Sequence, residues 1–301
     1  MGSIKEVAEE VYHFETIIPG VNSLFSTYLI RSDKSVLVEP GPGANIPNII
    51  EAIERLGMQP PSYIMPTHIH LDHGGSAGKL AELFPEAQII VHPHGAKHVI
   101  DPSRLINGTK GAFGADFEKL YGPILPVPES QVSIPADGET IDIGNRELTV
   151  VYTPGHTPNH IAIFDKKTSG LFCGEALGTP IQAAPYCPLP AVAPPSFNME
   201  EYLDTMEKLL GMKLRILFYS HDGIGKKPNK LIHCAIDNTQ AIGKIILKSL
   251  KTGERRDQIG YRIEEYITNR LGFKVELGEM DILIGGYMLY YSNKYGIPVT
   301  N

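Results

Sequence analysis

The chain carries Thr67-His68-Ile69-His70-Leu71-Asp72-His73-Gly74-Gly75 directly after the apolar run Tyr63-Ile64-Met65-Pro66. The apolar run predicts a short buried strand that ends at its proline. Side chains two positions apart share one face of an extended segment, so His68 and His70 can point at the same place. The aspartate and the third histidine follow where the chain turns, and two glycines let the backbone pass close to them. Packing gives no reason to gather these side chains, whereas a bound metal ion does.

Three later segments have the same form, an apolar run followed by a side chain of a type that binds metals. They are Leu148–His156, Gly170–Glu175 and Ile216–His221. Each brings one such side chain to the end of a predicted strand, where α/β folds tend to place their functional groups. Imidazole and carboxylate ligands suit zinc, iron or manganese. The sequence therefore predicts a metal site assembled from four separate segments.

Together these segments resemble the metallo-β-lactamase superfamily, in its glyoxalase II-like hydrolase branch. The resemblance covers about residues 10–225 and rests on the H-x-H-x-D-H signature at 68–73, on Pro154-Gly155-His156 and on Ser220-His221. It implies an α+β fold, the αββα sandwich of two packed sheets with helices outside. It also implies two sets of metal ligands, the first being His68, His70 and His156 and the second Asp72, His73 and His221.

The family normally supplies a bridging aspartate after the strand that contains Cys173, and this chain has Glu175 there. Glutamate is longer by one methylene, so it either bridges two metals from a retracted backbone or binds one metal only. We expect Glu175 to be a ligand, because a carboxylate stands at the right place. Cys173 is either a thiolate ligand or a small buried side chain below the site. Glu39, before the Pro/Gly turn at 40–43, either borders the metal site or is a surface carboxylate.

Composition limits the remaining possibilities. The 301 residues, 42% of them hydrophobic, can bury a large core. No apolar stretch reaches the roughly 18 residues of a membrane span, and the N-terminus lacks the order of a secretion signal, so we expect a cytoplasmic protein without a membrane partner. Three cysteines fit a reducing compartment without a disulfide framework. The net charge of −7 leaves no electrostatic footprint for nucleic acid.

The order of predicted elements is two β-rich halves followed by helices. Residues 1–225 are expected to form the metallo-β-lactamase-like αββα domain. Residues 226–301 are expected to form a helical extension packed on the core, with helices over 231–250, 257–271 and 281–293. This extension lines the pocket or makes a homodimer contact.

Two irregular stretches are candidates for substrate contact. Residues 101–129 are rich in glycine and proline and predict a flexible insertion with one short helix near 115–120. Phe113 and Tyr121 in this insertion either face substrate or clamp the loop down. The stretch 183–197 holds five prolines, too many for a helix or a central strand. Tyr186 in that stretch is a third candidate contact.

One further histidine cluster follows the strand predicted at 87–91. His92, His94 and His98 are expected to lie behind the ligands or to face substrate rather than to form another metal site, because the ligands above already satisfy two metals.

The residues and the resemblance together predict a metal-dependent hydrolase. One or two divalent ions, zinc in the first place with iron or manganese as alternatives, would hold a hydroxide and polarise a carbonyl group, and Asp72 would orient the nucleophile and move its proton. The expected reaction cleaves an ester-like bond, a thioester or a lactone, in a small-molecule substrate. The alternatives are a phosphodiesterase of the same fold and a metal-binding protein that has lost turnover. Glu175 is the oddity that motivates the second alternative.

Overall fold

The computed structural model describes residues 2–17, 24–113, 117, 121–180, 187–272 and 280–298. The chain divides into two compact units. The first comprises residues 1–152, 159–174 and 214–226, and the second comprises residues 153–158, 175–213 and 227–301. The second unit thus contains segments from the middle of the chain as well as its C-terminal part. The division into domains at residue 225 stays a prediction.

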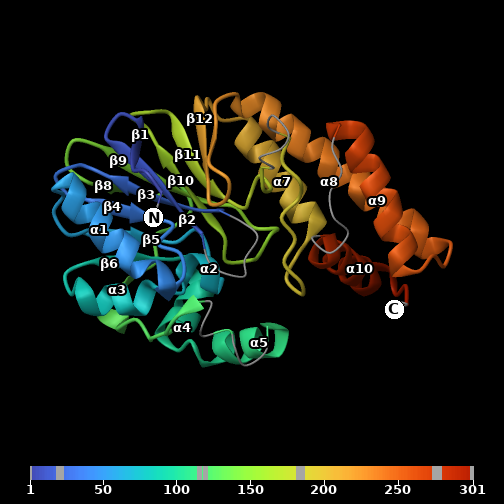
Figure 1. The fold of residues 1–301 in the computed structure, drawn as a ribbon, viewed down its shortest axis with the longest axis horizontal. Coiled ribbons are helices and arrows are strands. Elements are labelled where there is room, and N and C mark those ends of the chain that lie inside the picture. The colour runs from blue at the N-terminus through green and yellow to red at the C-terminus, as the bar shows by residue number, and fades with distance from the viewer. Residues whose placement is uncertain are drawn as a thin grey trace. The chain divides into compact units, whose positions relative to one another are not determined.

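The first unit contains a seven-stranded sheet whose strands lie in chain order. The strands are β1 (Lys5–Ala8), β2 (Val11–Ile17), β3 (Leu24–Ile30), β4 (Val36–Val38), β5 (Tyr63–Met65), β6 (Gln88–Ile90) and β7 (Val132–Ser133). Figure 1 labels strands β1 to β6 of this sheet. Neighbours from β1 to β4 pair antiparallel, whereas those from β4 to β7 pair in parallel. The carboxyl ends of β4 and β5 therefore meet at one edge, which brings the segments after Val38 and Met65 together.

The second sheet of this unit has six strands in the order β13-β12-β11-β10-β9-β8. They are β8 (Thr140–Asp142), β9 (Glu147–Tyr152), β10 (Ile161–Asp165), β11 (Gly170–Gly174), β12 (Ile216–Tyr219) and β13 (Ile224–Gly225). Buried side chains of both sheets form one hydrophobic cluster. In it the Tyr28 ring meets the rings of Phe172 and Phe218 edge to face, with centroids 5.2 and 5.4 Å apart. The two sheets thus face each other across a shared core.

Helices cover the other face of the first sheet. They are α1 (Ile46–Leu56), α3 (Ala77–Leu83) and α4 (Pro93–Ile100). Ile49 of α1 and Leu80 of α3 are fully buried with Leu37 and Ile64 of the sheet in a second cluster. Helix α1 ends at Gly57, whose left-handed backbone (φ 59°) is the usual helix stop.

The described helices of the second unit are α7 (Met199–Leu210), α8 (Pro228–Lys251), α9 (Arg256–Leu271) and α10 (Asp281–Tyr295). The last three correspond to the predicted C-terminal helices. Helix α7 was not predicted from the sequence. Its signal is Asn198, whose Oδ1 accepts hydrogen bonds from the backbone of Glu200 and Glu201 at 3.1 and 3.3 Å. An asparagine followed by two acidic residues is a favourable helix start.

The expectation of a flexible insertion is wrong for its first part. Residues Ser103–Phe113 form a helix, α5. Asp101 starts it, since its Oδ1 accepts from the backbone N–H of Ser103 at 3.1 Å. The glycines at 108 and 111 weaken a helix by only about 1 kcal/mol each, so they did not exclude one. The predicted helix at 115–120 lies outside the described residues except for Phe117.

The expectation of a chain without disulfides is also wrong. Cys187 and Cys234, which are 47 positions apart in the sequence, form a disulfide with Cα atoms 5.5 Å apart. A count of cysteines could not reveal this pair, because pairing depends on which residues meet in space. Cys173 remains a free, buried thiol. No helix within the described ranges is long and apolar enough to cross a membrane.

Candidate metal centre

His68 and His70 lie directly after β5 and bring their rings together. Nε2 of His68 is 2.8 Å from Nδ1 of His70. The segment between them is held in place by Asn159, whose Oδ1 accepts from the backbone N–H of Ile69 at 3.1 Å. The His160 ring stacks on the His68 ring with centroids 5.0 Å apart. Two imidazole nitrogens thus converge at the end of a buried strand.

Asp72 and His73 belong to a four-residue helix, α2 (Leu71–Gly74), where the sequence had indicated only a turn. Oδ2 of Asp72 is 3.4 Å from Nε2 of His73 and 4.0 Å from Nε2 of His221. One ligand-type atom from each of these three side chains lies within 4.8 Å of the others. A carboxylate and two imidazoles at this spacing fit a divalent metal ion.

Glu39 fixes the orientation of His73. Its Oε2 is 2.8 Å from Nδ1 of His73, and both side chains are buried. A hydrogen bond that occupies Nδ1 leaves Nε2 as the nitrogen that faces Asp72. Glu39 adopts a left-handed backbone (φ 54°), which is rare for a residue with a side chain and is found where the surrounding structure demands it. The structure therefore supports Glu39 as a residue that borders the metal site, and not as a surface carboxylate.

His221 is positioned by contacts with the start of β3. It follows β12 and forms an isolated β-bridge with Phe25, whose ring meets the imidazole edge to face at a centroid distance of 4.6 Å. The backbone N–H of Ser26 also donates to the carbonyl of Ser220 at 2.9 Å. These contacts join the start of β3 to the loop that carries His221.

His156 and Glu175 lie together in the second unit. Nε2 of His156 is 2.9 Å from Oε2 of Glu175. Nδ1 of His156 donates to the backbone carbonyl of Ala191 at 3.0 Å. This bond fixes the imidazole so that Nε2 is the nitrogen directed at Glu175. The pair is therefore a preformed imidazole and carboxylate donor set.

Tyr202 on α7 contacts the backbone of Glu175 and of Ala191, the residue that accepts from His156. Its hydroxyl donates to the carbonyl of Glu175 at 2.8 Å and accepts from the N–H of Ala191 at 3.3 Å. Sequence reasoning missed this residue because it missed the helix. The asparagine start signal at 198 would have predicted α7, but not the contacts of a tyrosine on it.

Cys173 is a buried thiol rather than an exposed ligand. Its side chain is fully buried, and its Sγ donates to the carbonyl of Phe218 at 3.4 Å. Burial raises the pKa of this thiol well above its usual value. The structure therefore supports the small buried side chain among the two readings of Cys173.

Of the three predicted substrate contacts, only the side chain of Tyr121 lies within the described structure. Tyr121 packs against Leu71 and Phe117 and is only 7% exposed. Burial raises the pKa of Tyr121 to about 12, with the charge of Asp72 as the second cause. Phe113 is the last residue of α5 and its side chain lies outside the described structure, as does all of Tyr186. All three stay predictions as substrate contacts.

The His92 cluster has a local structural role. The ring of His92 accepts from the backbone N–H of His94 at 3.0 Å and so caps α4. It also lies against Tyr152, with centroids 4.2 Å apart. Burial lowers the pKa of His92 to about 4, so this ring is neutral near pH 7. Among the described residues, the sets of side chains that lie close enough together to hold a metal ion do not include His92, His94 or His98.

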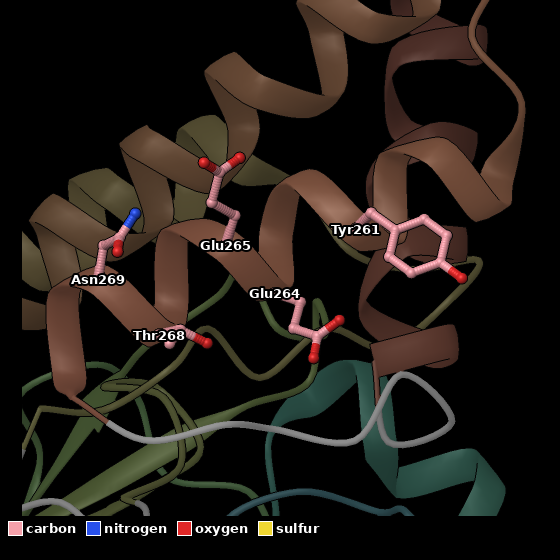
Figure 2. A pocket seen from close by; sticks show the side chains of 5 residues that line it. All are labelled: Tyr261, Glu264, Glu265, Thr268 and Asn269. Carbon is pink, nitrogen blue, oxygen red and sulfur yellow. The ribbon is translucent and has the colours of Figure 1, made fainter.

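A surface hollow of about 290 Å³ lies on α9 (Figure 2). It is lined by Tyr261, Glu264, Glu265, Thr268 and Asn269. All five side chains project from one helix, and none of them belongs to the ligand-type groups described above. The hollow is therefore a groove on a helix surface and no part of the candidate metal centre.

The model of the family described as "Metallo-beta-lactamase superfamily" matches residues 25–221. The chain belongs to this superfamily. The matched segment contains the H-x-H-x-D-H signature, His156, Glu175 and His221. The family resemblance and the αββα fold class expected from the sequence are thereby confirmed.

Several curated relatives match part of the chain. An uncharacterized protein of Aquifex aeolicus (strain VF5) is 31% identical over 147 residues, which are 49% of this chain and 61% of the relative. Glyoxylase B2 of Dictyostelium discoideum is 28% identical over 166 residues, which are 54% of this chain and 50% of the relative. The chain therefore matches less than two thirds of the length of these relatives.

Solved structures show the same fold over more of the chain. The metallo-beta-lactamase family protein TTHA1429 from Thermus thermophilus covers 95% of this chain and 94% of its own, at 19% identity and a TM-score of 0.70. The archaeal superfamily protein ST1585 from Sulfolobus tokodaii covers 78% of this chain and 86% of its own, at 18% identity and a TM-score of 0.62. At these identities the likeness concerns the fold alone.

Proposed function

We propose that the protein is a metal-dependent hydrolase of a small ester-like bond, a thioester or a lactone. The observation that carries the proposal is the convergence of Asp72, His73 and His221, whose ligand-type atoms lie within 4.8 Å of one another. The His73 ring among them is oriented by the buried Glu39 carboxylate. Such orientation of a ligand from behind is typical of functional metal sites.

We assign the ligands in two sets. Asp72, His73 and His221 would hold one divalent ion. The family resemblance assigns His68, His70 and His156 to another, with Glu175 as a further ligand. Three imidazoles and a carboxylate favour zinc, with iron or manganese as alternatives. Whether Glu175 serves one ion or bridges two remains part of this proposal.

A bound divalent ion would lower the pKa of water toward ~7 and polarise a carbonyl oxygen. The chain itself contributes Asp72, which is about one-third exposed at its side chain and can therefore meet a water molecule. A carboxylate at this position can accept a proton from an attacking water and pass it to the leaving group. No serine or cysteine nucleophile is needed, and the thiol of Cys173 is held protonated by burial.

The choice of a thioester or lactone rests on the family resemblance and on the name of one relative, Glyoxylase B2. Phosphodiester hydrolysis on the same metals is the second candidate, because polarisation by a metal serves a phosphoryl group equally well. A metal-binding protein without turnover is the third. We further propose a small-molecule substrate, no nucleic-acid or membrane partner, a cytoplasmic location and a homodimer. The net charge of −7 supports the absence of a nucleic-acid partner.

The test combines metal analysis with a substrate panel. Purified protein is loaded with zinc, iron or manganese in turn and assayed on thioesters, lactones and phosphodiesters. We expect turnover of an ester-like substrate that is lost in Asp72→Asn and His70→Ala but kept in His233→Ala, which removes an exposed histidine of α8. Full metal occupancy with no turnover on the panel would favour the binding protein. A protein that binds no divalent metal would contradict all three candidates.

A further inference from the structure

We propose that Tyr202 is a positioning residue for the His156 and Glu175 donors. The Tyr202 hydroxyl hydrogen-bonds to two backbone segments, one at Glu175 and one at Ala191. These segments determine where the two donor side chains lie. The inference rests on the proposed function, because it gives Tyr202 a role in metal binding. Tyr202, Glu175, Ala191 and His156, which make the contacts, all lie in the second unit.

The first contact acts on the carboxylate. The Tyr202 hydroxyl donates to the backbone carbonyl of Glu175 at 2.8 Å. Glu175 follows directly on Gly174, whose left-handed backbone (φ 53°) turns the chain out of β11. A glutamate carboxylate lies one methylene further from its backbone than an aspartate carboxylate, so the same tilt of the backbone displaces it further and a restraint on the backbone matters more. The hydrogen bond supplies that restraint.

The second contact acts on the imidazole through Ala191. The backbone N–H of Ala191 donates to the Tyr202 hydroxyl at 3.3 Å, and its carbonyl accepts from Nδ1 of His156 at 3.0 Å. The peptide groups on both sides of the Ala191 Cα are thus tied, one to the phenol and one to the ligand. If the phenol oxygen were lost, Ala191 would be restrained on one side only, and the His156 ring would follow it.

The segment that contains Ala191 is also anchored at its start, a few residues earlier in the chain. The disulfide joins Cys187 to Cys234 of α8, and Nδ2 of Asn238 donates to the carbonyl of Pro188 at 2.9 Å. These anchors fix the start of the segment. Tyr202 fixes its middle, at the residue that contacts the metal ligand.

The phenol ring has no freedom to move away from this position. Tyr202 is fully buried, and the Phe197 ring meets it edge to face with centroids 5.5 Å apart. At Gly155, beside the ligand, a Cβ atom would lie 2.3 Å from the Cα of Tyr202, so the ligand-bearing turn packs directly on the α7 backbone. A rigid, buried hydroxyl with two backbone partners orients them more firmly than a mobile one could.

The test compares Tyr202→Phe with Tyr287→Phe. Tyr287 is the matched control, because it is also fully buried in this unit and its hydroxyl also donates to a backbone carbonyl, that of Thr239 at 3.1 Å. Zinc affinity is measured by competition with a chromophoric chelator. We expect a loss of about 10-fold or more in Tyr202→Phe, as for other residues that orient metal ligands, and no loss in Tyr287→Phe.

A second readout needs no metal. Nitrogen-15 NMR of the histidine rings in the metal-free protein reports the state of Nδ1 of His156, which donates to the carbonyl of Ala191. We expect the same Nδ1–H resonance in the unchanged protein and in Tyr287→Phe, and a shifted one in Tyr202→Phe, because the bond to Ala191 is weakened there. Cobalt-loaded protein adds a third signature, since a shift of the visible bands in Tyr202→Phe alone reports altered ligand geometry.

Each other outcome counts against the inference. Unchanged zinc affinity and an unchanged Nδ1–H resonance in Tyr202→Phe would overturn it. Equal losses in both variants, or a Tyr202→Phe protein that fails to fold, would overturn it too, since these assign the phenol a general role in stability. If the unchanged protein binds no zinc, the proposed function fails. The NMR comparison then still decides whether Tyr202 orients His156.

Discussion

Oε2 of Glu39 lies 2.8 Å from Nδ1 of His73, and the two side chains are 1% and 0% exposed. The glutamate stands at the end of β4 and the histidine in α2, so the contact ties the loop after one parallel strand to the loop after its neighbour. A backbone hydrogen bond, from the N–H of Gly41 to the carbonyl of His73 at 2.9 Å, joins the same two loops. The orientation of the proposed ligand is thus set by the fold before any metal binds.

Replacing Glu39 by glutamine should therefore weaken metal binding. An amide is a poorer acceptor than a carboxylate, and it can present its NH₂ group to Nδ1 instead. We expect zinc affinity to fall by about 10- to 100-fold, measured by chelator competition. Glu147→Gln is the control, because Glu147 is about half exposed and pairs with Lys166 on the surface. Equal affinity of both variants would show that Glu39 does not orient His73.

Glu175 should be required for full metal content. Its carboxylate lies 2.9 Å from Nε2 of His156, and it stands where the family usually has an aspartate. We expect Glu175→Ala to bind less zinc per chain in elemental analysis, while Glu200→Ala on the exposed start of α7 keeps the full amount. Metal content and activity that are unchanged in Glu175→Ala would remove this residue from the ligands.

His13 should make the fold less stable in mild acid. Burial, with a smaller contribution from Lys5, lowers the pKa of His13 from 6.5 to about 4. The unfolded chain therefore binds a proton below about pH 6.5 that the folded protein takes up only near pH 4. The free energy of unfolding should fall across this window as pH falls, by up to about 3 kcal/mol from this residue.

Urea denaturation at pH 7, 6, 5 and 4 measures this effect. In His13→Gln the decline in stability with pH should be shallower, because the buried side chain no longer titrates. The amide can still contact Ser26, whose Oγ is 3.0 Å from the His13 ring. The exposed His233→Gln should keep the slope of the unchanged protein. A slope that His13→Gln leaves unaltered would contradict the assignment.

Breaking the disulfide should lower stability. The Cys187–Cys234 bond joins residues 47 positions apart. By restricting the unfolded chain, a cross-link over that distance stabilises the folded protein by about 4 kcal/mol at most. We expect Cys234→Ala to unfold at lower urea concentration than the unchanged protein. A reductant should destabilise the unchanged protein but not the variant. Three free thiols in the unfolded, unreduced protein would show that the bond does not form.

The sequence by itself determined the ligand types and the family. His68, His70, Asp72 and His73 lie within six positions, so a strand that ends in a turn can bring their side chains to one place. The strands that precede His156, Glu175 and His221 could be predicted, because each is an apolar run followed by a polar residue. The C-terminal helices were readable from their apolar periodicity.

Tertiary structure alone decided how those ligands are held. The bonds from Glu39 to His73, from Ala191 to His156 and from Tyr202 to Glu175 each join residues at least 27 positions apart. The disulfide likewise depends on two segments that meet in space. Contacts of this kind leave no local pattern, since hydrophobic periodicity and turn signals report only on neighbours within a few residues. What a side chain is can be read along the chain, but what orients it depends on the packing of distant segments.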